Sequence, residues 1–126
     1  MRVGGSRLGF LGFDDALYGS PSLPRALAAR AEADVEIWLI HAPEYFDILL
    51  ARGARPPLVL AGHTHGGQIR LPGFTPFTPP GSASYVSGWY HREERPLYVS
   101  RGIGTATIRA RLFCPPELPI FTLRPA

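Results

Sequence analysis

Lysine and asparagine are absent from this chain of 126 residues, and cysteine occurs once, as Cys114. One cysteine excludes an intramolecular disulfide and a zinc site built from cysteines, so we expect Cys114, in an apolar stretch before Pro115, to be a buried thiol. All 13 basic residues are arginines, and they are scattered without a basic run. This distribution argues against a dedicated nucleic-acid-binding surface, while the net charge of +3 suits a phosphate-bearing substrate.

Long apolar runs are absent as well. No stretch approaches the ~20 residues that a membrane-spanning helix needs, and residues 1–7 lack the apolar core of a signal peptide. We therefore expect a cytoplasmic protein whose contact with a membrane, where one is made, is peripheral. Glycine and proline are abundant, with 14 of each, which predicts many turns and few long helices.

The order of apolar runs and helical patterns predicts an α/β fold. Helices are predicted from an N-cap at Ser22 to about Ala33, and from Glu44 to Arg52. The alternation of strand and helix up to residue 61 indicates parallel strands with crossover helices, followed by an antiparallel hairpin. Strands are predicted at 8–13, 35–40, 58–61, 84–90, 96–100, 107–113 and 119–123.

The strongest candidate site is the segment 62–67, Gly-His-Thr-His-Gly-Gly, directly after the apolar run 58–61. In an extended segment, side chains two residues apart point to the same side, so His63 and His65 are expected to converge. His41 follows the strand 35–40, and ligands of parallel α/β sheets gather at the carboxyl ends of the strands. These three histidines are therefore candidate ligands of a divalent metal ion, and imidazole suits Mn, Fe or Zn. The alternative is a hydrogen-bonded pair of core histidines.

Other features of the sequence have two interpretations each. Arg101, beside Gly102, is a candidate substrate-binding residue through its forked donors, or else an ordinary arginine of a surface turn. Asp14 and Asp15 are neighbours that point to opposite sides of an extended chain, which favours turn or capping roles over a carboxylate pair. The proline-rich segment 72–81 is a lid or substrate wall, or a plain surface loop.

Four stretches carry a resemblance to a known family. They are Leu-Ile-His-Ala-Pro-Glu-Tyr-Phe at 39–46, Gly-His-Thr-His-Gly-Gly-Gln-Ile at 62–69, Leu-Tyr-Val-Ser-Arg-Gly-Ile-Gly-Thr at 97–105 and Cys-Pro-Pro-Glu at 114–117. Together they resemble the C-terminal half of a calcineurin-like metallophosphoesterase, and most of all its bacterial phosphodiesterase subgroup. The resemblance implies half of an α/β/β/α sandwich, with a mixed sheet, two helices and an antiparallel C-terminal portion.

The resemblance also implies a binuclear metal centre that hydrolyses phosphodiesters or phosphomonoesters. His41 and His63 would bind one ion and His65 the other, and two ions about 3.5–4 Å apart clamp a phosphoryl group. The substrate would be a phosphate ester, such as a phospholipid or a nucleotide-like diester. Within this chain no further catalytic residue is identified.

The family's Asp-x-His, Gly-Asp-x-x-Asp and Gly-Asn-His-Asp/Glu motifs are missing from residues 1–126. We therefore expect a single partial domain and an incomplete catalyst, because no carboxylate is evidently placed to bridge two ions. Two alternatives remain: a module that binds one ion through three histidines, or a structural remnant without catalysis. An exposed sheet edge, where the missing half would pair, favours self-association into a homo-oligomer.

Overall fold

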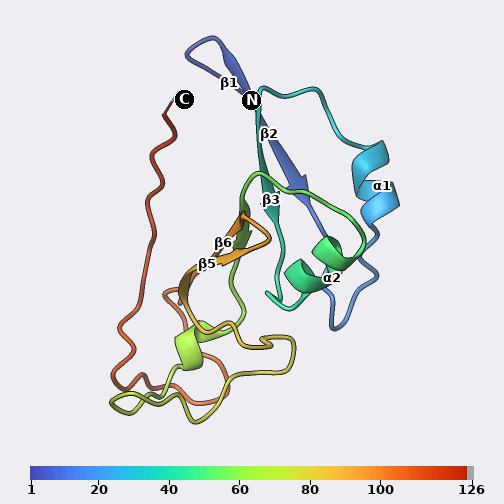
Figure 1. Cartoon of the computed structure of the whole chain (residues 1–126). Coiled ribbons are helices and arrows are strands. Elements are labelled where there is room, and N and C mark those ends of the chain that lie inside the picture. Colours follow the sequence, from blue (N-terminus) through green and yellow to red (C-terminus); the bar gives the residue numbers. More distant parts are fainter. Residues whose placement is uncertain (125–126) are drawn as a thin grey trace.

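The computed structural model describes residues 1–124 and has an α/β fold built on one mixed sheet of six strands, in the order β1-β2-β3-β4-β6-β5 (Figure 1). The strands are β1 (Arg2–Val3), β2 (Ser6–Gly12), β3 (Val35–Leu39), β4 (Val59–Ala61), β5 (Gly88–Arg92) and β6 (Arg95–Val99). The helices are α1 (Leu23–Ala28), α2 (Tyr45–Ala51) and the short 3-10 helix η1 (His65–Gly67).

Four neighbouring strands of the sheet run parallel. β2 pairs with β3, β3 with β4 and β4 with β6 in the same direction, while β1 and β5 are antiparallel at the two ends of the sheet. Helix α1 connects β2 to β3 and helix α2 connects β3 to β4, as the alternating pattern predicts. The predicted α/β class, the mixed sheet with two helices and the antiparallel C-terminal portion are confirmed. The carboxyl ends of the four parallel strands therefore lie along one edge of the sheet.

The hydrophobic core joins helix α2 to the central strands. Phe46 and Leu49 of α2 are completely buried, together with Val59 of β4 and with Leu97 and Val99 of β6. Alternation along β4 and β6 places these strand residues on one face of the sheet. This packing fixes β4 and β6 beside each other, and so fixes the loops that leave their carboxyl ends.

Helix α1 is shorter than the sequence predicts. Ser22 caps it through a hydrogen bond from the Arg25 N–H, but the helix ends at Ala28 rather than near Ala33. The charged residues that follow bind the neighbouring strands instead of completing another turn. Arg30 donates to Glu36 at 2.7 Å, and Asp34 accepts from the backbone N–H of Arg7 at 2.6 Å.

The predicted strands at 107–113 and 119–123 are wrong. In the described part of the chain, the segment after β6 contributes only an isolated bridge between Ile69 and Leu112. Three prolines at 115, 116 and 119 lack the N–H that a ladder needs. The segment before them is held by the Gln68 side chain, which binds Ala106 and Ile108, and by two backbone hydrogen bonds of Leu112. The hairpin also starts later than predicted, at Gly88, because the hydroxyl of Tyr90 accepts hydrogen bonds from the backbone N–H groups of Val86 and Ser87.

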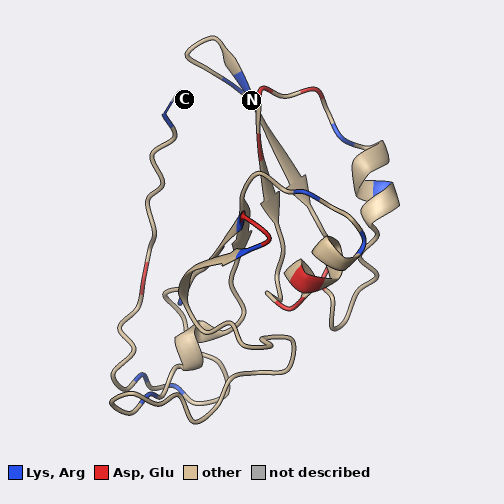
Figure 2. Ribbon diagram, in the orientation of Figure 1, with Lys and Arg blue, Asp and Glu red and all other residues tan. Residues whose placement is uncertain are grey.

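Charge and apolar surface are both spread out. Figure 2 shows the arginines distributed over loops, strands and helix rather than gathered in one run, as the sequence indicates. On β2 and β3, the apolar side chains of Phe10, Val35 and Leu39 are exposed, and β1 pairs only with the first two residues of β2. Leu8 still exchanges backbone hydrogen bonds with Met1, so residues 9–12 lack a strand partner on one side in the part of the chain that the structure describes. Among the described residues, no helix is long and apolar enough to cross a membrane.

Candidate functional site

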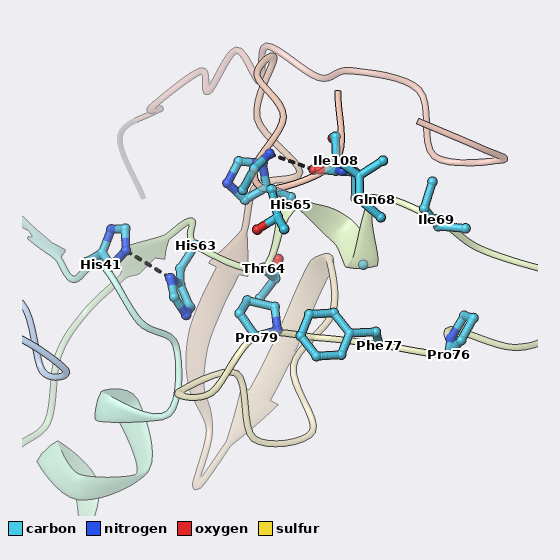
Figure 3. Close-up of a pocket in the computed structure, with 13 residues that line it drawn as sticks. His41, His63, Thr64, His65, Gln68, Ile69, Pro76, Phe77, Pro79 and Ile108 are labelled. Carbon is cyan, nitrogen blue, oxygen red and sulfur yellow. Dashed lines mark hydrogen bonds between the residues drawn. The ribbon is translucent and has the colours of Figure 1, made fainter. Parts of the chain in front are cut away.

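Two histidines meet at the carboxyl edge of the sheet. His41 follows β3 and His63 follows β4, and a backbone hydrogen bond from Gly62 to the His41 carbonyl (3.3 Å) places the two segments side by side. Nδ1 of His63 lies 2.9 Å from Nε2 of His41, and the ring centroids are 4.7 Å apart (Figure 3). The strand-end position predicted from the sequence is what brings the two rings together.

The carbonyl of Pro80 fixes the orientation of His63. Nε2 of His63 lies 2.7 Å from this oxygen, which can only accept a hydrogen bond. We therefore assign the proton of the neutral ring to Nε2, which leaves a lone pair on Nδ1 directed at His41. Metal-bound histidines commonly have their second nitrogen held in this way by a carbonyl oxygen. The loop 72–81 thus contributes to the site through its backbone.

Asp15 is a third member of this edge, and sequence reasoning missed it. It follows β2, and its Oδ2 lies 3.5 Å from Nε2 of His41. Its other oxygen, Oδ1, accepts from the backbone N–H groups of Leu17 and Tyr18, so the predicted turn role is also present. These two hydrogen bonds lower the pKa of Asp15, and the nearby imidazoles lower it further. The strand-end argument that selected His41 would have selected Asp15 as well.

His65 does not join the pair, because the backbone between the two histidines is not extended. φ is 68° at His63 and 51° at His65, and His65 begins the 3-10 helix η1. The rule that side chains two residues apart share a side therefore fails here. Figure 3 shows the His65 ring apart from the pair that His41 and His63 form. Its Nδ1 atom is buried and has no hydrogen-bond partner in the structure.

The glycine pair after His65 permits this sharp turn. Gly66 and Gly67 have φ values of 63° and 76°, which side chains disfavour. A Cβ at Gly66 would lie 2.5 Å from Cγ of Arg101, and one at Gly67 would overlap Thr75. Thr64 completes the turn: its buried hydroxyl donates to the Val86 carbonyl and accepts from the Gly66 N–H.

Comparison with known proteins finds relatives that match most of this chain. The metallophosphoesterase YkuE of Bacillus subtilis is 36% identical to the chain over 122 residues, 95% of this chain. The phosphodiesterase YaeI of Escherichia coli is 38% identical over 68% of the chain, and a metallophosphoesterase of Helicobacter pylori is 34% identical over 84%. The chain belongs to the metallophosphoesterases.

The metallophosphoesterase chain matches only part of each of these relatives. It covers 42% of the Bacillus protein, 31% of the Escherichia coli protein and 28% of the Helicobacter protein. No family model matches the chain, and no solved structure matches it at a significant level. The predicted family is confirmed, and the partial coverage agrees with the predicted partial sandwich.

A cavity of about 500 Å³ adjoins all three candidate histidines. The other side chains that line the cavity are mostly apolar, and they come from separate segments of the chain. Pro76, Phe77 and Pro79 belong to the loop 72–81, so that loop forms a wall of the site. The opposite wall is made by Ile69 and Ile108. Polar donors at one end and apolar walls at the other are typical of small-molecule sites.

Arg101, the predicted substrate contact, lies near the site but not on the cavity. Its Nε donates to Glu117 at 2.5 Å, and Glu117 also accepts from the hydroxyl of Tyr98. Its side chain packs against Gly66 and is absent from the cavity lining. The substrate-binding role of Arg101 stays a prediction.

Arg111 was not singled out from the sequence, yet it holds the His65 turn in place. Its guanidinium donates to the His65 carbonyl at 3.2 Å and to the carbonyls of four more residues, Arg101, Gly102, Gly104 and Cys114. Cys114 is buried as predicted, with Sγ 3.4 Å from the same His65 carbonyl. A guanidinium with its planar array of donors can join several loops in this way.

The donors of this metallophosphoesterase chain fit part of a metal centre. His41 and His63 direct ring nitrogens at each other, and the orphaned Nδ1 of His65 is a further available donor. Within the described residues, no three His, Cys, Asp or Glu side chains are grouped so as to hold an ion. Two imidazoles are a suitable but incomplete ligand set for Zn, Fe or Mn.

Proposed function

We propose that this chain carries part of the binuclear metal centre of a phosphoesterase that hydrolyses phosphodiesters or phosphomonoesters. The observation that carries the proposal is the convergence of Nε2 of His41 and Nδ1 of His63 at 2.9 Å, at the carboxyl ends of adjacent parallel strands. His41 and His63 are the ligands of one divalent ion, and His65 contributes to a second.

The chain's own residues orient these donors. Pro80 keeps the Nδ1 lone pair of His63 available, and Arg111 holds the turn that carries His65. When bound, divalent ions of this kind polarise a phosphoryl oxygen and lower the pKa of a bound water, so that hydroxide is available near neutral pH. Mn, Fe and Zn all suit imidazole donors, and the ligand types alone do not select among them.

The substrate is a phosphate ester. One relative is named a phosphodiesterase, which supports a diester. The apolar walls around Phe77 and Ile108 accommodate an apolar or planar group attached to the phosphate, as in a phospholipid or a nucleotide-like diester. The modest positive charge of the chain favours association with an anion of this kind.

The chain alone supplies too few ligands for two ions. His41, His63 and His65 are three donors, whereas metal ions of this type take four or more ligands each. We therefore expect weak catalysis from the 126-residue chain and strong catalysis only where further protein completes the centre.

A second candidate is a module that binds one ion. It is favoured by the separation of His65 from the His41–His63 pair. Only His41 and His63 have ring nitrogens close enough to each other to share one ion. A single ion on this pair with water as further ligands would suffice for binding without a binuclear mechanism.

The test is metal stoichiometry by elemental analysis after loading with Mn²⁺, together with turnover of bis(4-nitrophenyl) phosphate. Variants His63→Ala and His65→Ala are compared with His91→Ala, a control on the exposed hairpin. About two ions per chain would contradict the expected incompleteness of this chain, because three histidines supply too few ligands for two ions. One ion lost in His63→Ala, with weak turnover that falls further in His65→Ala, supports part of a binuclear centre. One ion with turnover unaffected by His65→Ala supports the single-ion module, and no ion in the unaltered chain contradicts both.

A further inference from the structure

Asp15 lies at the edge of the sheet where three neighbouring strands end. Its hydrogen bonds to its own turn, at Leu17 and Tyr18, do not account for its contact with His41. β2, β3 and β4 are adjacent and parallel, and they end before Asp15, His41 and His63 respectively. A backbone hydrogen bond from Phe13 to the Leu39 carbonyl, at 3.0 Å, continues the ladder past β2 and draws the Asp15 loop toward His41.

The two carboxylate oxygens of Asp15 have different neighbours. Oδ1 faces its own loop and accepts from Leu17 and Tyr18 at 2.6 and 3.0 Å. Oδ2 faces His41, at 3.5 Å from the same Nε2 atom that lies against His63. The loop therefore fixes the rotamer through one oxygen and presents the other to the histidine pair.

The charge of Asp15 has no arginine partner. Within residues 1–124, its one ion-pair contact is with His41, whereas Glu36, Asp47 and Glu117 each pair with an arginine. About a quarter of the Asp15 side chain is exposed, so its charge is only partly screened by solvent. A partly buried anion 3.5 Å from Nε2 of His41 favours a cation at that point.

We infer that Asp15 is the anionic member of the metal centre, positioned by its turn to strengthen the binding of a divalent ion held by His41 and His63. The inference rests on the proposed function and deepens it, because it gives this chain a carboxylate that the sequence motifs do not supply. Asp15 acts through its charge on the ion and on the His41 ring rather than as a third ligand, because no three His, Cys, Asp or Glu side chains of the described residues are grouped to hold an ion.

Asp14 provides a matched control. It is the adjacent residue and also an aspartate, but its oxygens accept from the backbone N–H groups of Asp15 and Ser20. It has no contact with either histidine among the described hydrogen bonds and ion pairs. Asp14→Asn therefore tests the integrity of the loop, while Asp15→Asn tests the charge at the centre.

The substitution Asp15→Asn is well suited to the question because an amide oxygen can still accept from Leu17 and Tyr18. The experiment is titration calorimetry of the full chain with Mn²⁺ and with Zn²⁺, for the unaltered chain, Asp15→Asn, Asp14→Asn and His63→Ala. Thermal unfolding in EDTA accompanies it and reports any structural effect without an ion. We expect Asp15→Asn to weaken ion binding by about 10- to 100-fold, the range for residues that support metal ligands, with an unchanged Tm in EDTA.

The outcomes separate this inference from the function on which it rests. Unchanged affinity in Asp15→Asn, with binding lost in His63→Ala, overturns the role of Asp15 and leaves the metal centre standing. Equal weakening in Asp14→Asn and Asp15→Asn assigns the effect to the loop and also overturns the inference. No binding by the unaltered chain overturns the proposed function, and the role of Asp15 falls with it.

Discussion

Nδ1 of His63 lies 2.9 Å from Nε2 of His41, although the two residues are 22 positions apart in the chain. The contact depends on the parallel pairing of β3 with β4, because both histidines leave the sheet at the same edge. His65, only two positions from His63, does not join the pair, because the backbone between them is left-handed rather than extended. In this protein the topology of the sheet, rather than nearness in sequence, pairs the candidate ligands.

The first prediction concerns that pair. If His41 and His63 hold the same ion, the effects of removing them are not additive, because either loss already removes the site. We expect His41→Ala, His63→Ala and the double variant to lower Zn²⁺ affinity to a similar extent in titration calorimetry. A shared ion would be contradicted if the loss of Zn²⁺ binding free energy in the double variant equalled the sum of the losses in the two single variants.

The glycine pair gives a second prediction. Gly66→Ala forces a side chain into a left-handed conformation and against Arg101, so we expect it to lower the free energy of unfolding by about 1–3 kcal/mol. Gly104→Ala is the control, because its Cβ would meet open space and its φ is not in the left-handed region. Urea unfolding measures both. Equal stability of the two variants would mean that the His65 turn adapts to a side chain.

Arg111 gives a third prediction. Arg111→Ala removes the donors that join the His65 carbonyl to the loop 101–104, and we expect a loss of about 2 kcal/mol in the free energy of unfolding. Arg111→Lys should recover only part of it, because one ammonium cannot reach so many acceptors. Arg109→Ala, an exposed neighbour, should have little effect. If chemical unfolding gave Arg109→Ala and Arg111→Ala the same loss in the free energy of unfolding, this role of Arg111 would be refuted.

A fourth prediction concerns Tyr85 and the stability of the fold at high pH. Burial, followed by the hydrogen bond from its hydroxyl to Asp47, raises the pKa of Tyr85 from 10.0 to about 12. Because the folded state holds the proton more tightly than the unfolded state, this contribution to stability is complete below pH 10.0 and is lost as the pH rises toward about 12. We expect the urea midpoint to fall less steeply over this range in Tyr85→Phe than in the unaltered chain. The pKa of Tyr98 is also raised to about 12, so part of the slope should remain in Tyr85→Phe.

The sheet face around Phe10 gives a fifth prediction. Phe10 is 53% exposed within the part of β2 that lacks a partner strand on one side, and exposed apolar edges favour self-association. We expect sedimentation velocity to detect oligomers that Phe10→Arg reduces. Leu118→Arg, at a side chain that is 80% exposed outside the strands, is the control. A monomer at all concentrations, or equal effects of both variants, would contradict self-association through this face.

The sequence by itself determined the α/β order, the strand-end position of His41 and His63, and the family. The order and the strand ends follow from short-range rules: apolar runs form buried strands, Ser22 caps a helix, and glycines mark where the chain turns. The family follows from the resemblance that motifs such as 62–69 carry. The same rules gave wrong predictions where contacts between residues remote in the chain decide the local structure. Helix α1 ends early because Arg30 and Asp34 bind neighbouring strands. Segment 107–113 forms no strand: its Ile108 carbonyl accepts from the Gln68 side chain, and its Arg111 side chain binds carbonyls outside the segment.

Only the tertiary structure decided which side chains meet. The orientation of His63 depends on the Pro80 carbonyl, 17 positions away, and the contact of Asp15 with His41 depends on the pairing of β2 with β3. The separation of His65 depends on φ angles that a pattern of residue types does not specify. Local propensity thus selects the elements and their ends, whereas the site arises from the register of parallel strands, because only that register sets distances between residues remote in the chain.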